Sequence, residues 1–129
     1  MIFLKKRAKN SFYGAELISK VARESNCDVV VDIGSGIGYL SSTLMVKHHL
    51  NVVGLERNPK LNESAAKRVE TIMKRKIEGK PQNGAEIKFL DLTLDPLMES
   101  KTFEEMITRQ FGKDKKYLLV IRPFFLSLL

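Results

Sequence analysis

Three glycines at alternating positions follow a short run of valines in this sequence. Gly34, Gly36 and Gly38 come directly after DVVVDI, and Asp32 lies two residues before the first of them. Without a Cβ atom, glycine lets the main chain turn sharply and approach a ligand closely. A helical pattern begins at Tyr39, and a helix directs unpaired N–H groups and the positive end of its dipole towards its N-terminus. The sequence therefore predicts a nucleotide-type binding site; a turn that serves only tight packing is the alternative.

Glu56 follows these glycines at a sequence separation that suits a residue binding the ribose of a nucleotide. Glu56 closes a predicted strand over 51–56 and lies 22 residues after Gly34. Dinucleotide-binding folds place their ribose-binding acid about 20 residues after the glycines. One carboxylate has acceptors for two neighbouring hydroxyl groups. We therefore predict that Glu56 binds a ribose, the alternative being a glutamate that is merely on the surface.

The elements that must position these residues alternate between strand and helix. Helices are predicted over 11–24, 39–49, 59–78 and 102–111, with Asn58 as the cap of the third. Strands are predicted over 29–31, 51–56, 85–90 and 117–121. Strands that alternate with helices favour a parallel sheet with right-handed crossovers. The sequence predicts one α/β domain over residues 1–129.

Helical spacing also predicts which side chains face the core. The stripe of the first helix is predicted to be Tyr13, Leu17, Ile18 and Val21, and Ser11 is its candidate cap. A short basic arm is predicted before this helix. Its cations are Lys5, Lys6, Arg7 and Lys9. No strand is predicted in this arm.

Composition limits the class of protein. The chain has 129 residues, of which 43% are hydrophobic and 29% charged, as expected for one soluble globular domain. Its one cysteine, Cys27, excludes an internal disulfide framework and is expected to be a small core residue in a reducing compartment. No stretch approaches the roughly 20 apolar residues that span a bilayer, and no export signal is recognised. We expect a cytoplasmic or nuclear protein that is not inserted in a membrane.

The charge balance leaves two interpretations of the basic residues. Twenty-two Lys and Arg against fifteen Asp and Glu give a net charge of +7, which favours association with polyanions such as nucleic acid. The cations are scattered over the predicted helices, so a solvated basic face is the other interpretation. His48 and His49 are adjacent and point in different directions on a helix, so no metal site is predicted.

The stretch DIGSGIGY over 32–39, with its G-x-G-x-G spacing, resembles the first motif of the class I, Rossmann-like methyltransferases that bind S-adenosylmethionine. Within that superfamily the chain is most similar to the group related to methyltransferase-like protein twenty-five. The similar residues are Lys5-Lys6, VVDIGSGIGYLSSTL over 30–44 and VVGLE over 52–56. The resemblance implies a Rossmann-like three-layer sandwich with a mainly parallel sheet.

The same resemblance implies roles for the acidic residues. The glycine turn would pass under the methionine part of S-adenosylmethionine, and Glu56 would take the ribose hydroxyls. Asp91, which ends the predicted strand 85–90, resembles the residue that accepts a hydrogen bond from the adenine amino group. A carboxylate that caps the next turn is the alternative for Asp91.

The chain departs from this family in two places. Ala8 and Lys9 stand where the group usually has a His-Glu pair, and Arg122-Pro123-Phe124-Phe125 is not the Asn/Asp-Pro-Pro-Tyr pattern that holds a planar amine. A complete domain has the strand order 3-2-1-4-5-7-6, of which this chain supplies 3-2-1-4. We therefore expect the N-terminal, cofactor-binding half of a methyltransferase domain, either truncated or completed by a partner chain, with an exposed edge at 117–121.

Four functions remain open at this point. The first is methyl transfer from S-adenosylmethionine to an unidentified acceptor, and the second is a non-catalytic cofactor-binding or regulatory module of the same fold. An NAD-type dehydrogenase is disfavoured by the short glycine spacing. Simple nucleic-acid association through the net charge is the fourth. No catalytic residue is predicted.

Overall fold

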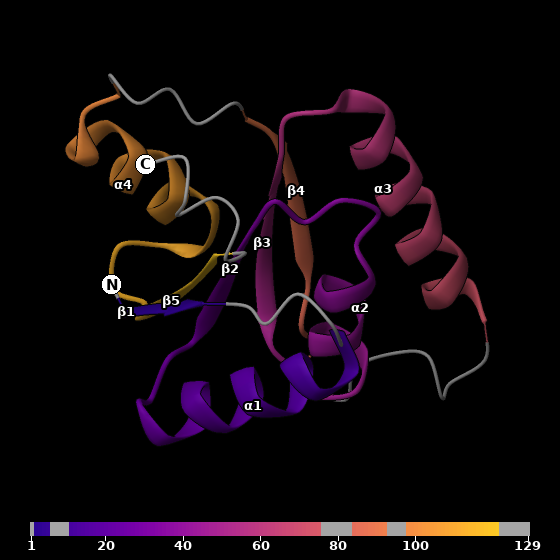
Figure 1. Ribbon diagram of the computed structural model, residues 1–129, viewed down its shortest axis with the longest axis horizontal. Helices are drawn as coiled ribbons and strands as arrows, with labels where there is room; N and C mark the ends of the chain where they lie inside the picture. Colours follow the sequence, from indigo (N-terminus) through magenta and orange to yellow (C-terminus); the bar gives the residue numbers. More distant parts are fainter. Residues whose placement is uncertain (1, 6–10, 76–83, 93–97, 122–129) are drawn as a thin grey trace.

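A computed structural model describes residues 2–5, 11–75, 84–92 and 98–121 (Figure 1). The elements in chain order are β1 (Ile2–Lys5), α1 (Ser11–Glu24), β2 (Val29–Ile33), α2 (Tyr39–Val46), β3 (Asn51–Glu56), α3 (Pro59–Lys74), β4 (Ile87–Asp91), α4 (Ser100–Phe111) and β5 (Tyr117–Ile121). The four predicted strands and four predicted helices are all present. The parts of the predictions that concern 6–10, 76–83 and 122–129 lie outside the described residues.

One parallel sheet has the order β1-β5-β2-β3-β4. The predicted order 3-2-1-4 is confirmed, because β4, β3, β2 and β5 are neighbours in that sequence. The predicted exposed edge along 117–121 is wrong. β1 pairs in parallel with β5, from Ile2 opposite Leu118 to Lys5 opposite Ile121, so the residue predicted to begin a basic arm ends a strand.

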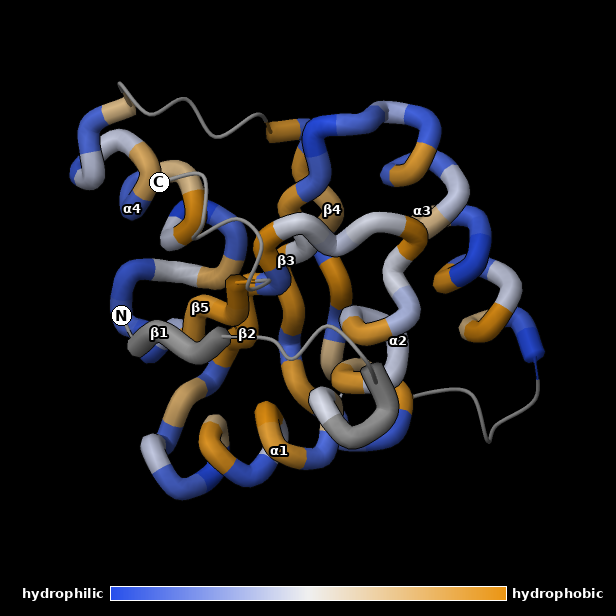
Figure 2. Tube along the Cα trace, viewed as in Figure 1, coloured by the Kyte–Doolittle hydropathy of each residue, from blue (hydrophilic) through white to orange (hydrophobic). Residues whose placement is uncertain are grey.

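The helices form layers on both faces of the sheet (Figure 1). Side chains alternate between the faces of a strand, and accordingly Val30 packs with α1 and α2 while Val29, Val31 and Ile33 pack on the face of α4. All five residues of β2 are buried. Figure 2 shows the apolar strands gathered between these layers. The Rossmann-like three-layer arrangement is confirmed.

Helix α1 buries a different set of residues from the predicted one, and helix α2 ends earlier than predicted. In α1, Ala15, Ile18 and Ala22 face the core, whereas Leu17 is 47% exposed, so its place in the predicted stripe is wrong. Helix α2 ends at Val46, three residues before the predicted end, and His49 has a φ of 56°, which is outside the helical region. Cys27 is buried in the core, as predicted, and burial raises the pKa of its thiol.

Candidate cofactor-binding site

The glycine turn connects the carboxyl end of β2 to the N-terminus of α2. Gly34, Gly36 and Gly38 have φ values of 74°, 58° and 81°, in the left-handed region that residues with a Cβ atom rarely adopt. A Cβ atom at Gly38 would lie 3.1 Å from Ala65 Cβ and 3.2 Å from Phe89 Cζ. The alternating glycines are therefore required by the backbone itself, and Gly38 is also required by the close approach of α3 and β4.

Glu56 points at this turn. Its Oε1 accepts a hydrogen bond from the Gly36 N–H at 3.1 Å, and its Oε2 accepts one from the Asn58 N–H at 2.9 Å. A carboxylate has about four acceptor positions. Each oxygen of Glu56 therefore keeps capacity for one further donor, and the two oxygens are fixed in direction by the main chain. This is the arrangement that two neighbouring hydroxyl groups of a ribose require.

Asp32 lies beneath the turn rather than in it. Its side chain is fully buried, and its Oδ2 accepts a hydrogen bond from the equally buried Ser41 hydroxyl at 2.6 Å. Ser41 belongs to the first turn of α2, so this bond ties the end of β2 to the start of the helix. Asp32 is thus placed to position the glycines, and direct contact between Asp32 and a ligand stays a prediction.

Asp91 stands beside Glu56 at the carboxyl edge of the sheet. The two residues are register partners of β4 and β3. The Asn62 side chain of α3 donates to the Glu56 carbonyl at 3.0 Å and to the Leu90 carbonyl at 3.1 Å, and it also contacts Asp91 Oδ1. Asn62 therefore joins both strands at the point where the two carboxylates emerge. Asp91 is exposed, and its bond to an adenine amino group stays a prediction.

Two buried polar atoms of this region have no hydrogen-bond partner among the described residues. They are Oγ of Ser35, within the glycine turn, and Oδ1 of Asn62. Buried polar atoms are normally satisfied, because leaving one unpaired costs about 1–3 kcal/mol. Glycines that leave room for close approach, a fixed carboxylate and unsatisfied polar atoms together fit the amino-acid and ribose parts of S-adenosylmethionine.

Sequence reasoning predicted the glycines, Glu56 and Asp91 but missed Ser41 and Asn62. Neither residue forms part of a recognised spacing pattern, since Ser41 bonds a partner 9 residues away and Asn62 bonds partners 6 and 28–29 residues away. The signal that was present is the polar type of each residue and its place near the start of a helix. A serine in the first turn of a buried helix and an asparagine one turn after a cap are both candidates for such bonds.

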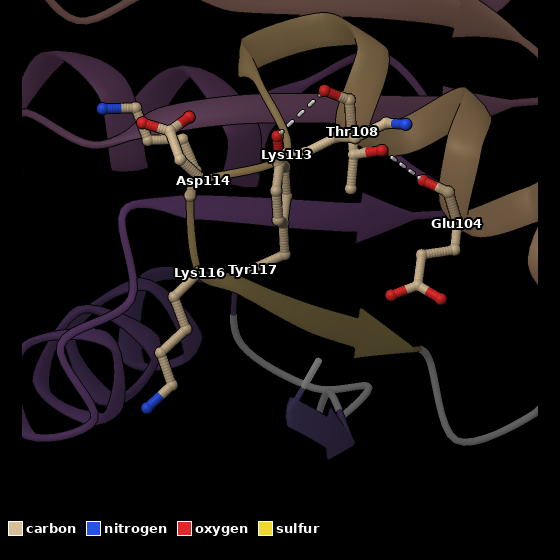
Figure 3. Close-up of a pocket in the computed structure, with 7 residues that line it drawn as sticks. Glu104, Thr108, Lys113, Asp114, Lys116 and Tyr117 are labelled. Atoms are coloured by element: carbon tan, nitrogen blue, oxygen red, sulfur yellow. Dashed lines mark hydrogen bonds between the residues drawn. The ribbon is translucent and has the colours of Figure 1, made fainter.

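A pocket lies at the N-terminal end of β5, the end away from the glycine turn (Figure 3). It has a volume of about 200 Å³ and is lined by Glu104, Thr108, Lys113, Asp114, Lys115, Lys116 and Tyr117. The buried Tyr117 hydroxyl donates to the Gly112 carbonyl at 2.7 Å, and burial raises its pKa. The G-x-G-x-G turn over 34–38 does not line this pocket, so the predicted cofactor site stays at the carboxyl edge.

The described residues form neither a candidate metal site nor a candidate membrane span. Within 2–5, 11–75, 84–92 and 98–121, no three His, Cys, Asp or Glu side chains gather as metal ligands would. None of the helices in these ranges has the length and apolar character needed to cross a bilayer.

The fold and the glycine turn define a Rossmann-like domain of the type found in S-adenosylmethionine-dependent methyltransferases. A family described as a methyltransferase domain matches residues 10–108, and the chain belongs to that family. Probable methyltransferase-like protein 25 of Mus musculus is 37% identical over 60 residues, which are 46% of this chain and 10% of that protein. The chain thus matches only a small part of the length of this relative.

Two solved structures also resemble the chain. A putative caffeoyl-CoA O-methyltransferase from Staphylococcus aureus has 21% identity and a TM-score of 0.47, with 89% of this chain and 58% of that chain covered. Magnesium protoporphyrin IX methyltransferase from Synechocystis, with bound S-adenosylmethionine, has 13% identity and a TM-score of 0.45, with 84% and 62% covered.

Proposed function

We propose that this domain binds S-adenosylmethionine at the carboxyl edge of its sheet and takes part in methyl transfer to an acceptor that is not yet identified. The observation that carries the proposal is the hydrogen bond from the Gly36 N–H to Glu56 Oε1. It holds a ribose-type acceptor against a main-chain turn that has no side chains of its own at 34, 36 and 38. Membership of the methyltransferase domain family supports the choice of cofactor.

Each residue of the site has one task in this proposal. Gly34 and Gly36 admit the amino-acid part of the cofactor, and Gly38 lets the turn pack against Ala65 and Phe89. Glu56 accepts hydrogen bonds from both ribose hydroxyls. Asp91 accepts from the adenine amino group, and Asp32 positions the turn through Ser41. When bound, S-adenosylmethionine supplies a methyl group on a sulfonium sulfur. Because transfer requires alignment of acceptor and methyl carbon, these residues contribute mainly by positioning.

Calorimetric titration with S-adenosylhomocysteine tests the proposal. The unsubstituted chain should bind, and Glu56→Gln should bind at least about tenfold more weakly, because one charged acceptor is replaced by a neutral amide. Gly36→Arg should abolish binding, since a side chain would enter the turn at a positive φ.

The matched control is Glu63→Gln, which removes the same charge from an exposed ion pair with Lys67 on α3. Its affinity should equal that of the unsubstituted chain. Failure of the folded, unsubstituted chain to bind would refute the cofactor assignment. Binding that survives both Glu56→Gln and Gly36→Arg would refute the site.

A non-catalytic cofactor-binding module is the second candidate. Arg122-Pro123-Phe124-Phe125 follows β5 in place of the Asn/Asp-Pro-Pro-Tyr pattern, which favours this candidate. It predicts cofactor binding without methyl transfer to any acceptor. Incubation with cofactor labelled in the methyl group, with pools of RNA and protein as acceptors, separates the two functions.

We further propose a cytoplasmic or nuclear location, supported by the free, buried Cys27. A partner chain that extends the sheet would pair along an edge strand, β1 or β4, because β5 is already flanked by β1 and β2. Cell fractionation and the mass of the purified chain in solution test these two statements.

A further inference from the structure

A groove on α3 carries two arginines on one side of the helix. Arg68, Thr71, Ile72 and Arg75 line a volume of about 280 Å³. Their spacing of three, four and seven residues places all four on one face. Helix α3 lies at the outside of the helical layer that it shares with α2 (Figure 1). The groove therefore opens on the surface of the molecule, with cations at both ends and the apolar Ile72 between them.

The charge of this groove is not neutralised within the described part of the chain. Two lysines of the same helix are paired with glutamates one turn earlier, at 3.1 Å for Lys67 with Glu63 and 2.8 Å for Lys74 with Glu70. In contrast, neither Arg68 nor Arg75 forms an ion pair with any described residue. Two cations without an ion pair to a described residue therefore line the groove, whereas Lys67 and Lys74 on the same helix are paired.

An aromatic ring lies beside the groove, stacked against Arg68. Tyr39 is the first residue of α2 and is 51% exposed, although Arg68 stacks on it with the guanidinium carbon 3.6 Å from the ring centroid. One face of the ring is covered by the guanidinium, and the exposure of the ring leaves surface for a second planar group. Nε of Arg68 is buried and has no hydrogen-bond partner within the described residues.

We propose that Tyr39, Arg68 and Arg75 form a binding site for single-stranded nucleic acid. Arginine guanidinium groups bind phosphate through paired N–H donors. Unpaired bases stack on aromatic rings and on guanidinium planes, which is how proteins hold single strands without reading their sequence. An acidic peptide would satisfy the two charges but not the stacked ring, so a base-bearing polyanion fits the whole groove better.

The position of the groove links it to the candidate cofactor site. Tyr39 directly follows Gly38, the last glycine of the turn. A strand bound on Tyr39 would therefore pass close to the turn. The inference that this nucleic acid is the methyl acceptor rests on the proposed function. The inference that the nucleic acid binds here does not.

Fluorescence anisotropy with a labelled, mixed-sequence RNA of about 20 nucleotides, which exceeds the site size of about 4–16 nucleotides of single-strand-binding domains, measures this binding. The titration is done without cofactor, so its result is independent of S-adenosylhomocysteine binding. Arg68→Gln and Arg75→Gln should each weaken binding about tenfold at low salt. Each should also lower the slope of log affinity against log salt by about 0.7, as expected for one lost phosphate contact on a single strand.

The matched controls are Lys67→Gln and Lys74→Gln, which remove the same charge from the same helix at paired positions. Both should change the affinity less than about twofold. Tyr39→Leu should weaken binding about tenfold through loss of stacking, and Tyr39→Phe should retain it. Circular dichroism and thermal unfolding establish that each variant is folded.

Several results would overturn the proposal. Equal losses in the arginine and lysine variants would show that only bulk charge matters. Equal affinity for duplex DNA, or for polyglutamate, would show that no unpaired base is held. Absence of RNA binding at low salt by the folded chain would also refute it. Comparison of RNA with DNA of the same sequence then identifies which single strand is preferred.

Discussion

Glu56 and Asp91 are register partners at the carboxyl ends of two neighbouring parallel strands. The parallel pairing of β3 with β4 sets the spacing of these two carboxylates. The Asn62 side chain adds a cross-link at the same point, since it donates to the main-chain carbonyls of both strands and contacts Asp91. The helix that is capped by Asn58 is therefore tied to the strand ends that carry the two acids.

Replacement of Asn62 by alanine should lower the free energy of unfolding by about 1–3 kcal/mol, because the part-buried carbonyls of Glu56 and Leu90 each lose a hydrogen bond from the amide. Urea denaturation monitored by circular dichroism measures the change. Ser64→Ala, at an exposed position of the same helix, is the control and should change stability by less than about 0.5 kcal/mol. An Asn62→Ala variant as stable as Ser64→Ala would contradict the assigned role.

Ser41→Ala should destabilise the chain by about 1–3 kcal/mol or more, because the buried Asp32 loses a hydroxyl donor at 2.6 Å. The double-mutant cycle with Asp32→Asn isolates this interaction. We expect the two substitutions to be non-additive by at least about 0.5 kcal/mol. Strict additivity would show that Ser41 and Asp32 act independently.

Gly54→Ala tests the packing between β3 and β4. A Cβ atom at Gly54 would lie 2.7 Å from Phe89 Cδ1, so we expect a loss of about 1–3 kcal/mol from overpacking. The contrasting variant is Gly14→Ala in α1, where nothing lies within 4 Å of the new atom. That change should stabilise the chain by about 0.5–1 kcal/mol through helix propensity.

Phe89→Leu provides the second half of the Gly54 test. The smaller side chain should recover part of the stability lost in Gly54→Ala. If the double variant is no more stable than Gly54→Ala alone, the contact with Phe89 is not the cause of the loss.

His48 gives the stability a dependence on pH. Burial, together with the nearby cations Lys47 and Arg23, lowers the pKa of His48 from its ordinary value of 6.5. Between the lowered pKa and 6.5 the unfolded chain binds more protons than the folded chain, so stability falls on acidification through this window. The stability that the neutral His48 contributes is fully lost only when the pH is below the pKa of His48 in the folded chain.

Urea denaturation at a series of pH values from about 7.5 downwards, on either side of the ordinary histidine pKa, measures this fall. His48→Gln should flatten the curve over the window below 6.5. His49→Gln, a substitution of the adjacent residue, should leave the His48-dependent fall in place. An unchanged slope in His48→Gln would contradict the stated cause.

The parts of the fold that the sequence predicts are those with local signals. The glycine turn and Glu56 were predictable because a conformational requirement and a fixed distance along the chain define them. The cap at Asn58 is confirmed by its bond from the Lys60 N–H at 3.0 Å. Each of these features depends on residues within about one strand–helix unit.

The parts that were missed depend on partners far along the chain. Ser41 and Asn62 are ordinary helix residues until their partners in β2, β3 and β4 are in place. Leu17 illustrates a different limit, because a large apolar residue in α1 was favoured over the small Ala15, whose size allows the helix to pack closely. Hydrophobicity alone does not give the phase of a short helix.

The pairing of β1 with β5 has a consequence for the order of folding. Strands β2, β3 and β4 can meet once residue 91 has been synthesised, but β1 has no neighbour until residues 118–121 have followed. Among the strands of this sheet, β1 is therefore the last to find its neighbour, and contacts of such long sequence separation form slowly. In a nascent chain, residues 2–5 would stay unpaired until β5 had been synthesised.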